Sequence, residues 1–175
     1  IVFVGSSIFH RWTELQQHMA PLPVVNIAFD GAVTDDWNRL IEFRVLPLKP
    51  RVVVYYCGSN DVDLGEPAGP IVKRIHTFVD RVHTAMPRTR VVFVSVIRAP
   101  EKRDRFDVVD AINAQMRKLA ERNPGVQFVD VNPGLEHSDA SPRVELFMND
   151  QLHLRPAAYD ILAKMLKPVL TEAIR

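Results

Sequence analysis

Three residues near the two ends of the chain carry the side chains that nucleophilic catalysis needs. Ser7 follows an apolar, strand-like run over residues 1–4 and a Gly5-Ser6 corner, after which residues 8–18 continue at helical spacing. A sharp strand-to-helix turn leaves a side chain at the carboxyl edge of a sheet and points free helix N–H groups at whatever binds there. We therefore predict that Ser7 is a nucleophile whose own N–H helps to hold a developing oxyanion.

Asp150 and His153 supply the general base and its orienting partner. An aspartate three residues before a histidine can accept the Nδ1–H of the imidazole and leave Nε2 facing a serine. The neutral imidazole would then take the serine proton, and Asp150 would fix the tautomer and stabilise the imidazolium. Either residue has a simpler alternative role, Asp150 as a helix cap and His153 as a structural histidine. Ser7 could likewise only cap the first helix.

Two further residues fit as oxyanion donors. Gly31 follows the second apolar run, and Asn60 follows the third. A glycine lets a backbone N–H approach a substrate closely, and the side-chain amide of asparagine can donate across a site. Asp61, next to Asn60, is expected to fix the loop.

The elements that must position these residues alternate along the chain. Apolar, β-branched runs predict five strands, at residues 1–4, 23–27, 51–57, 90–96 and 126–131. Helical spacing predicts further helices at 37–45 (capped by residues 34–36), 70–85, 108–119 and 156–174. Residues 98–105 read as a polar connector, and 132–149 as a long loop with one short helical turn. This alternation favours a single α/β domain over residues 1–175, with a parallel sheet covered on both faces and ligands at its carboxyl edge.

The composition excludes several classes of function. The net charge of +1 and the mixed-sign clusters give no nucleic-acid footprint, and no apolar run is long enough to span a membrane. The five histidines other than His153 show no metal-ligand spacing, and we expect neither a metal nor an organic cofactor. Cys57, the single cysteine, is expected to be a buried, inert thiol. Because the chain starts inside a strand without methionine, we expect residues upstream, so localisation stays open. The sequence does not indicate an oligomeric state.

Taken in order, the motifs resemble a known family. Gly5-x-Ser7, Gly31, Gly58-x-Asn60-Asp61 and Asp150-x-x-His153 are similar to the four blocks of the SGNH (GDSL-type) hydrolase superfamily, in a bacterial branch with Gly-Ser-Ser at the nucleophile. The resemblance covers essentially the whole chain. It implies a flavodoxin-like, three-layer α/β/α sandwich whose five strands are ordered 2-1-3-4-5. It also implies a serine esterase in which Ser7, Asp150 and His153 form the triad and Ser7, Gly31 and Asn60 the oxyanion hole.

Three departures from the family pattern bear on the substrate rather than on the mechanism. Ser6 replaces the usual aspartate, Ala28 and Asp30 stand in a second block that is often glycine-rich, and Gln151 replaces a common glycine. Because the chain is compact and lacks a lid-sized insertion, we expect a shallow site for short acyl groups such as acetyl, carried on a small alcohol or a carbohydrate. The residues that flank the site and could form its pockets are Phe9, His10, Ile97 and Arg98.

Other functions remain open from the sequence. A lysophospholipase or thioesterase would use the same triad, and a binding module could keep the fold without turnover. A flavodoxin-like nucleotide-binding domain is disfavoured because Gly5-Ser6-Ser7 is too short for a phosphate loop. Carboxylate pairs such as Asp35/Asp36 and Glu136/Asp139 fit cap and loop chemistry better than that of a glycosidase.

Overall fold

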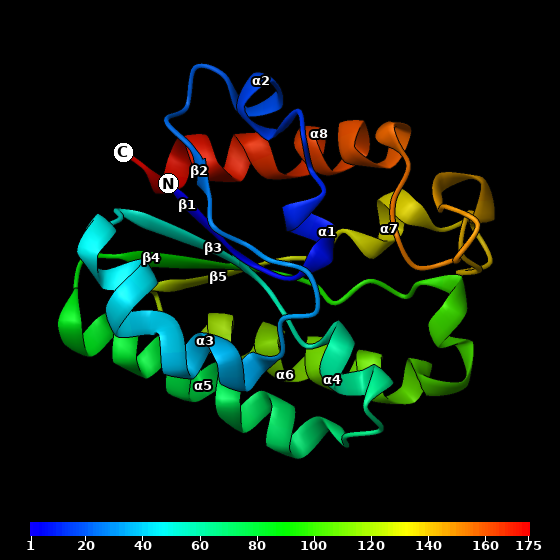
Figure 1. Cartoon of the computed structure of the whole chain (residues 1–175), viewed down its shortest axis with the longest axis horizontal. Coiled ribbons are helices and arrows are strands. Elements are labelled where there is room, and N and C mark those ends of the chain that lie inside the picture. The colour runs from blue at the N-terminus through cyan, green and yellow to red at the C-terminus, as the bar shows by residue number, and fades with distance from the viewer.

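Five parallel strands form one sheet in the order β2-β1-β3-β4-β5 in the computed structural model, which describes residues 1–175 (Figure 1). The strands are β1 (Val2–Gly5), β2 (Val25–Asn26), β3 (Val52–Tyr56), β4 (Arg90–Val94) and β5 (Val126–Val129). The central strands β1 and β3 are fully buried, as their continuous apolar runs predict for a sheet covered on both faces. The strand order expected from the family resemblance is confirmed.

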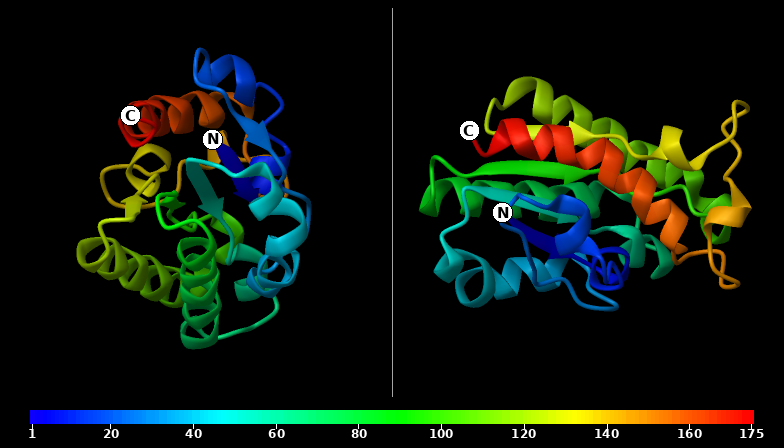
Figure 2. Two further views of the ribbon diagram at one scale, coloured as in Figure 1. Left: turned by 90° about the vertical axis from the view of Figure 1, so that its left-hand side faces the viewer. Right: turned by 90° about the horizontal axis from the view of Figure 1, so that it is seen from above.

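Helices cover both faces of the sheet (Figures 1 and 2). One face carries α2 (Leu15–Met19) and α8 (Pro156–Ala173), and the other carries α3 (Thr34–Leu40), α5 (Ala68–Ala85) and α6 (Phe106–Arg122). Three one-turn helices follow strands at the carboxyl edge of the sheet: α1 (Ser7–His10), α4 (Ser59–Asp63) and α7 (Asn132–Leu135). The remaining helical segments are η1 (Ile41–Val45), η2 (Leu46–Leu48), η3 (Pro100–Arg105) and η4 (Val144–Leu146).

Alternate strand residues feed two separate cores. Phe3 and Val54 point to the layer of α2 and α8, whereas Val4 and Tyr55 point to the layer of α3, α5 and α6. This alternation follows from the two-residue period of a strand, and it makes both sheet faces apolar. The sheet is therefore a rigid platform, and the polar residues that follow its strands gather at one edge.

The prediction of one continuous helix over residues 8–18 is wrong. The chain forms α1, leaves helical geometry around Trp12, and resumes in α2. Trp12 packs edge-on against Phe3, and its indole N–H donates to His18 Nδ1 at 2.9 Å. Burial of Trp12 in the core therefore overrides the local helical pattern.

Two other segments are more ordered than expected. The connector at 98–105 contains the helical segment η3, and the stretch 132–149 contains α7 and η4 together with a bridge between Glu136 and Pro142.

The helix expected at 37–45 begins earlier, at Thr34, and passes through η1 into η2. Val33, the residue before this helix, donates its backbone N–H to the Asp36 carboxylate at 2.9 Å and so caps the N-terminus. None of the helices has the length and apolar character needed to cross a membrane.

Candidate active site

Ser7 is the first residue of α1, directly after the carboxyl end of β1. The turn requires glycine at position 5, because a Cβ there would lie 2.2 Å from the carbonyl oxygen of Tyr56. Ser6 then donates its N–H to the same carbonyl at 3.1 Å, and its own carbonyl accepts the N–H groups of Phe9 and His10. This close packing against β3 places Ser7 at a helix N-terminus, where backbone N–H groups lack partners inside the helix.

The two predicted oxyanion donors lie on neighbouring segments that contact one another. Gly31 has a φ of 75°, in the left-handed region that glycine adopts without strain. The next residue, Ala32, accepts a 2.9 Å hydrogen bond from Asn60 Nδ2 and a 3.3 Å contact from Cys57 Sγ. Asn60 therefore uses one amide hydrogen to hold the Gly31 loop, and its amide group has a second hydrogen to donate.

Asp61 ties α4 to the start of α3, next to the Gly31 loop, through its bonds to Thr34. Its carboxylate is fully buried, and it accepts the backbone N–H of Thr34 and the Thr34 hydroxyl, the latter at 2.6 Å. Arg74, from α5, donates to the same carboxylate at 3.0 Å and also pairs with Glu66. A buried charge needs such pairing. The loop-fixing role expected for Asp61 is thus borne out by its contacts.

Asp150 and His153 form a hydrogen-bonded pair in the turn before α8. His153 Nδ1 lies 2.7 Å from Asp150 Oδ2, while Asp150 Oδ1 accepts the backbone N–H groups of Leu152 and His153, each at 3.0 Å. Burial alone would raise the pKa of Asp150. The hydrogen bonds from the His153 ring and from the two backbone N–H groups outweigh it and lower the pKa to about 2. The carboxylate is therefore ionised at neutral pH, as an orienting partner must be.

Further contacts tie α1, which begins at Ser7, to its neighbours. Asn26 donates to the carbonyl of Phe9, and His10 Nδ1 lies 3.0 Å from the carbonyl of Ala28. Tyr159, in α8, donates its hydroxyl to the carbonyl of Ile8 at 2.9 Å. The segments that carry Ser7, Gly31 and His153 thus belong to one connected framework.

The residues predicted to form the substrate pockets divide into three groups. Phe9 and Ile97 are at most 1% exposed and lie in the core, so the expectation that they line an open pocket is corrected. Phe9 joins the core layer of α2 and α8 from helix α1, and Ile97 joins the same layer from the segment that follows β4. His10 is exposed beside Ala28 and stays a candidate for the pocket rim.

Arg98 faces a different hollow. Its guanidinium lies over the Phe106 ring, 4.4 Å from the centroid, and pairs with Glu136 and Asp110 at 3.5 and 3.6 Å. Arg98, Asp110 and Glu136 line a hollow of about 230 Å³. Burial, opposed by Arg98, raises the pKa of the Glu136 carboxyl. Acidic partners thus already pair with Arg98, and none of Ser7, Asp150 and His153 lines this hollow.

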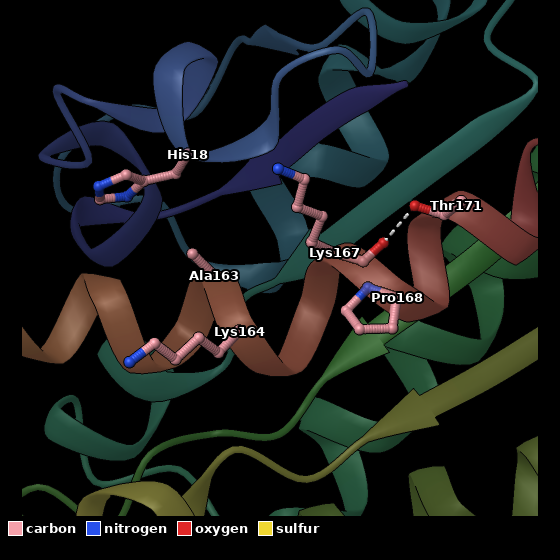
Figure 3. Close-up of a pocket in the computed structure, with 6 residues that line it drawn as sticks. All are labelled: His18, Ala163, Lys164, Lys167, Pro168 and Thr171. Carbon is pink, nitrogen blue, oxygen red and sulfur yellow. Dashed lines mark hydrogen bonds between the residues drawn. The ribbon is translucent and has the colours of Figure 1, made fainter.

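Two larger hollows are also lined by residues other than Ser7, Asp150 and His153. One of about 600 Å³ runs along α8 beside His18 of α2, and Figure 3 shows its lining residues. The others on α8 are Ala163, Lys164, Lys167, Pro168 and Thr171. One of about 950 Å³ lies near the amino ends of β3 and β4. No group of three or more His, Cys, Asp or Glu side chains is placed to hold a metal ion.

Asn60→Ala tests the oxyanion assignment. Removing one such donor typically costs about 10²- to 10³-fold in kcat, and we expect a loss of that size on p-nitrophenyl acetate with little change in KM. Cys57→Ala is the matched control, because it removes the other side-chain contact to the Ala32 carbonyl. It should lower stability but not kcat. Equal losses in the two variants, or an unchanged kcat in Asn60→Ala, would contradict the assignment.

Solved structures with the same fold cover nearly the whole chain. A GDSL-like lipase from Bacteroides thetaiotaomicron has a TM-score of 0.83 at 21% identity, over 98% of this chain and 87% of that one. A carbohydrate esterase family 3 protein from Talaromyces cellulolyticus has a TM-score of 0.79 at 18% identity, over 99% and 98%. An acetyl esterase mutant with acetate ion has a TM-score of 0.76 at 17% identity, over 99% and 98%. At these identities the likeness shows the fold.

Sequence comparison gives the family directly. No curated protein matches the chain. The model of the GDSL-like lipase/acylhydrolase family matches residues 4–161, a span that runs from β1 into α8 and includes Ser7, Gly31, Asn60, Asp150 and His153. The chain therefore belongs to the GDSL-like lipase/acylhydrolase family and is a carboxylic ester hydrolase.

Proposed function

We propose that the chain hydrolyses short-chain esters, acetyl esters above all, through a Ser7-His153-Asp150 triad. The observation that carries the proposal is the 2.7 Å contact between His153 Nδ1 and Asp150 Oδ2. It leaves Nε2 as the free basic atom of the imidazole at the edge of the sheet where Ser7 begins α1. The side chain of His153 is 13% exposed, which shelters the base while leaving it accessible.

The reaction would proceed in two halves. Ser7 Oγ attacks the ester carbonyl as His153 Nε2 takes its proton, and the N–H groups of Ser7 and Gly31 and the Asn60 amide hold the oxyanion. His153 then protonates the alcohol oxygen as its bond to the carbonyl carbon breaks, which leaves Ser7 acylated. Water adds to the acyl-enzyme with its proton passing to His153, and the acid departs as Ser7 recovers that proton.

Acetyl groups are the acyl chains that the site favours. Neither the hollow of about 600 Å³ nor that of about 950 Å³ is lined by Ser7, Asp150 or His153, so neither supplies a deep acyl channel. Two proteins of the same fold are an acetyl esterase and a carbohydrate esterase, which is consistent with acetyl groups on a sugar or another small alcohol.

One observation favours a lysophospholipase or thioesterase instead. Leu64 directly follows α4 and is 71% exposed, and Met148, two residues before Asp150, is 45% exposed. Apolar side chains beside both halves of the site could carry a longer acyl chain along the surface.

Initial rates on p-nitrophenyl esters from acetate to dodecanoate separate these functions. We expect kcat/KM to be highest for acetate or butyrate and to fall as the chain lengthens, and we expect acetate release from acetylated monosaccharides. A maximum at decanoate or dodecanoate that Leu64→Ser abolishes, while Phe43→Ser on the exposed surface of η1 does not, would establish the long-chain alternative. No cleavage of any ester would leave a binding module.

A further inference from the structure

The segment η3 lies between the two halves of the proposed site. On one side, the Lys102 ammonium pairs with the carboxylate of Asp63, the last residue of α4, and Arg105 donates to the carbonyl of Glu66 at 2.9 Å. On the other side, the backbone N–H of Glu101 donates to the carbonyl of Gln151 at 3.1 Å. No hydrogen bond or ion pair joins α4 directly to residues 149–153, so η3 is the polar link between them.

Lys102 is buried although it lies in a polar segment. The residue is 2% exposed, and its ammonium contacts Asp63 and, at 2.9 Å, Glu101. Lysine is rarely buried so completely unless it is paired, because removing the ammonium from water is costly. The carboxylates of Asp63 and Glu101 are only partly buried. The buried charge of this cluster is therefore the Lys102 ammonium, which lies against the end of α4.

Both elements that η3 contacts carry residues of the proposed mechanism. Asn60 and Asp63 are three residues apart in α4, one helical turn, so the position of Asp63 sets that of Asn60. Gln151 lies between Asp150 and His153 and has a φ of 58°, a left-handed conformation that side-chain-bearing residues seldom adopt. Its carbonyl bond to η3 therefore helps to hold the backbone turn that presents His153.

We propose that Lys102 is a positioning residue for catalysis. Through Asp63 and η3 it holds the oxyanion donor Asn60 at a fixed spacing from the Asp150–His153 turn. The inference rests on the proposed function, because the spacing matters only if both groups act on one substrate. Lys102 itself touches neither substrate nor reacting atoms.

The test compares three variants on p-nitrophenyl acetate: Lys102→Met, which keeps the aliphatic stem and removes the charge, Asp63→Asn, and the double variant. Displacing a catalytic group by about 1 Å can cost about 10²-fold, so we expect kcat to fall by about 10- to 100-fold. KM should stay within about threefold of the wild type, since binding of a small ester is not affected. The double variant should lose no more than Lys102→Met alone, because Lys102→Met already removes the pair with Asp63.

Lys164→Met is the matched control, since Lys164 is an exposed lysine of α8 and should leave kcat unchanged. Asp63→Asn keeps the test decisive if Lys102→Met does not fold, since the Asp63 carboxylate is one-third exposed. An unchanged kcat in Asp63→Asn, additive losses, or losses that match the folded fraction measured by thermal unfolding would overturn the inference. If the wild type is active and Ser7→Ala is not, such a result removes the role of Lys102 and leaves the proposed esterase standing.

Discussion

Replacing Ser7 with alanine should lower kcat on p-nitrophenyl acetate by about 10⁴- to 10⁶-fold, the range seen when a serine hydrolase loses its nucleophile. The substitution removes the oxygen that forms the acyl-enzyme but leaves the oxyanion donors in place, so a small residual rate over water should remain. Initial rates at saturating substrate measure the loss, and circular dichroism checks that the variant is folded.

The neighbouring serine provides the control. Ser6 is as buried as Ser7, and its hydroxyl has no hydrogen-bond partner. Ser6→Ala should therefore keep kcat within about threefold of the wild type, because only hydroxyls that form bonds or attack the substrate contribute. Comparable losses in the two variants would mean that any substitution in the Gly5-Ser6-Ser7 turn impairs the enzyme. The loss in Ser7→Ala would then not identify Ser7 as the nucleophile.

Replacing Asp150 with asparagine should lower kcat by about 10⁴-fold. An asparagine can keep its oxygen toward the backbone N–H groups of Leu152 and His153, the role that Oδ1 plays now. Its amide nitrogen then faces His153 Nδ1 in place of Oδ2. That nitrogen donates, so Nδ1 must accept, the ring proton moves to Nε2, and the base facing Ser7 is blocked.

The loss should appear in kcat and kcat/KM together, because the tautomer matters only as the proton leaves Ser7. Asp139→Asn is the matched control. The Asp139 carboxylate is exposed, lies in the 132–149 stretch that precedes Asp150, and accepts hydrogen bonds only from Ser141. Its kinetics should equal those of the wild type. If Asp150→Asn retained more than about a tenth of wild-type kcat, Asp150 would be a structural cap and not part of a triad.

The sheet was predictable because its information is local. Runs such as residues 51–57 combine β-branched side chains with abrupt Gly and Asn stops, and neither depends on distant contacts. The candidate residues could be picked out from the sequence for the same reason, since Ser7, Gly31 and Asn60 each follow a strand by only a few positions. Their catalytic roles stay predictions, supported by the turn geometry and by the Asp150–His153 contact.

The supporting contacts were not predictable because their partners are far apart in the chain. Tyr159 bonds to the carbonyl of Ile8 across 151 residues, and Arg74 reaches Asp61 and Thr34 from another helix. Lys102 sits in a stretch whose mixed charges are typical of a solvated connector, and only the fold shows that it turns inward. Phe9 and Ile97 were misplaced for a related reason: proximity to the site in sequence does not tell which face of the sheet a side chain joins.

Labelling with a fluorophosphonate, followed by peptide mass spectrometry, tests the central claim most directly. The reagent phosphonylates a serine only where a base removes its proton and donors hold the developing oxyanion. We predict one equivalent of adduct on the peptide that contains Ser7, with loss of ester hydrolysis in proportion, and no adduct in Ser7→Ala. An enzyme that cleaves p-nitrophenyl acetate at full rate after labelling, or an adduct at another residue, would contradict a Ser7 nucleophile.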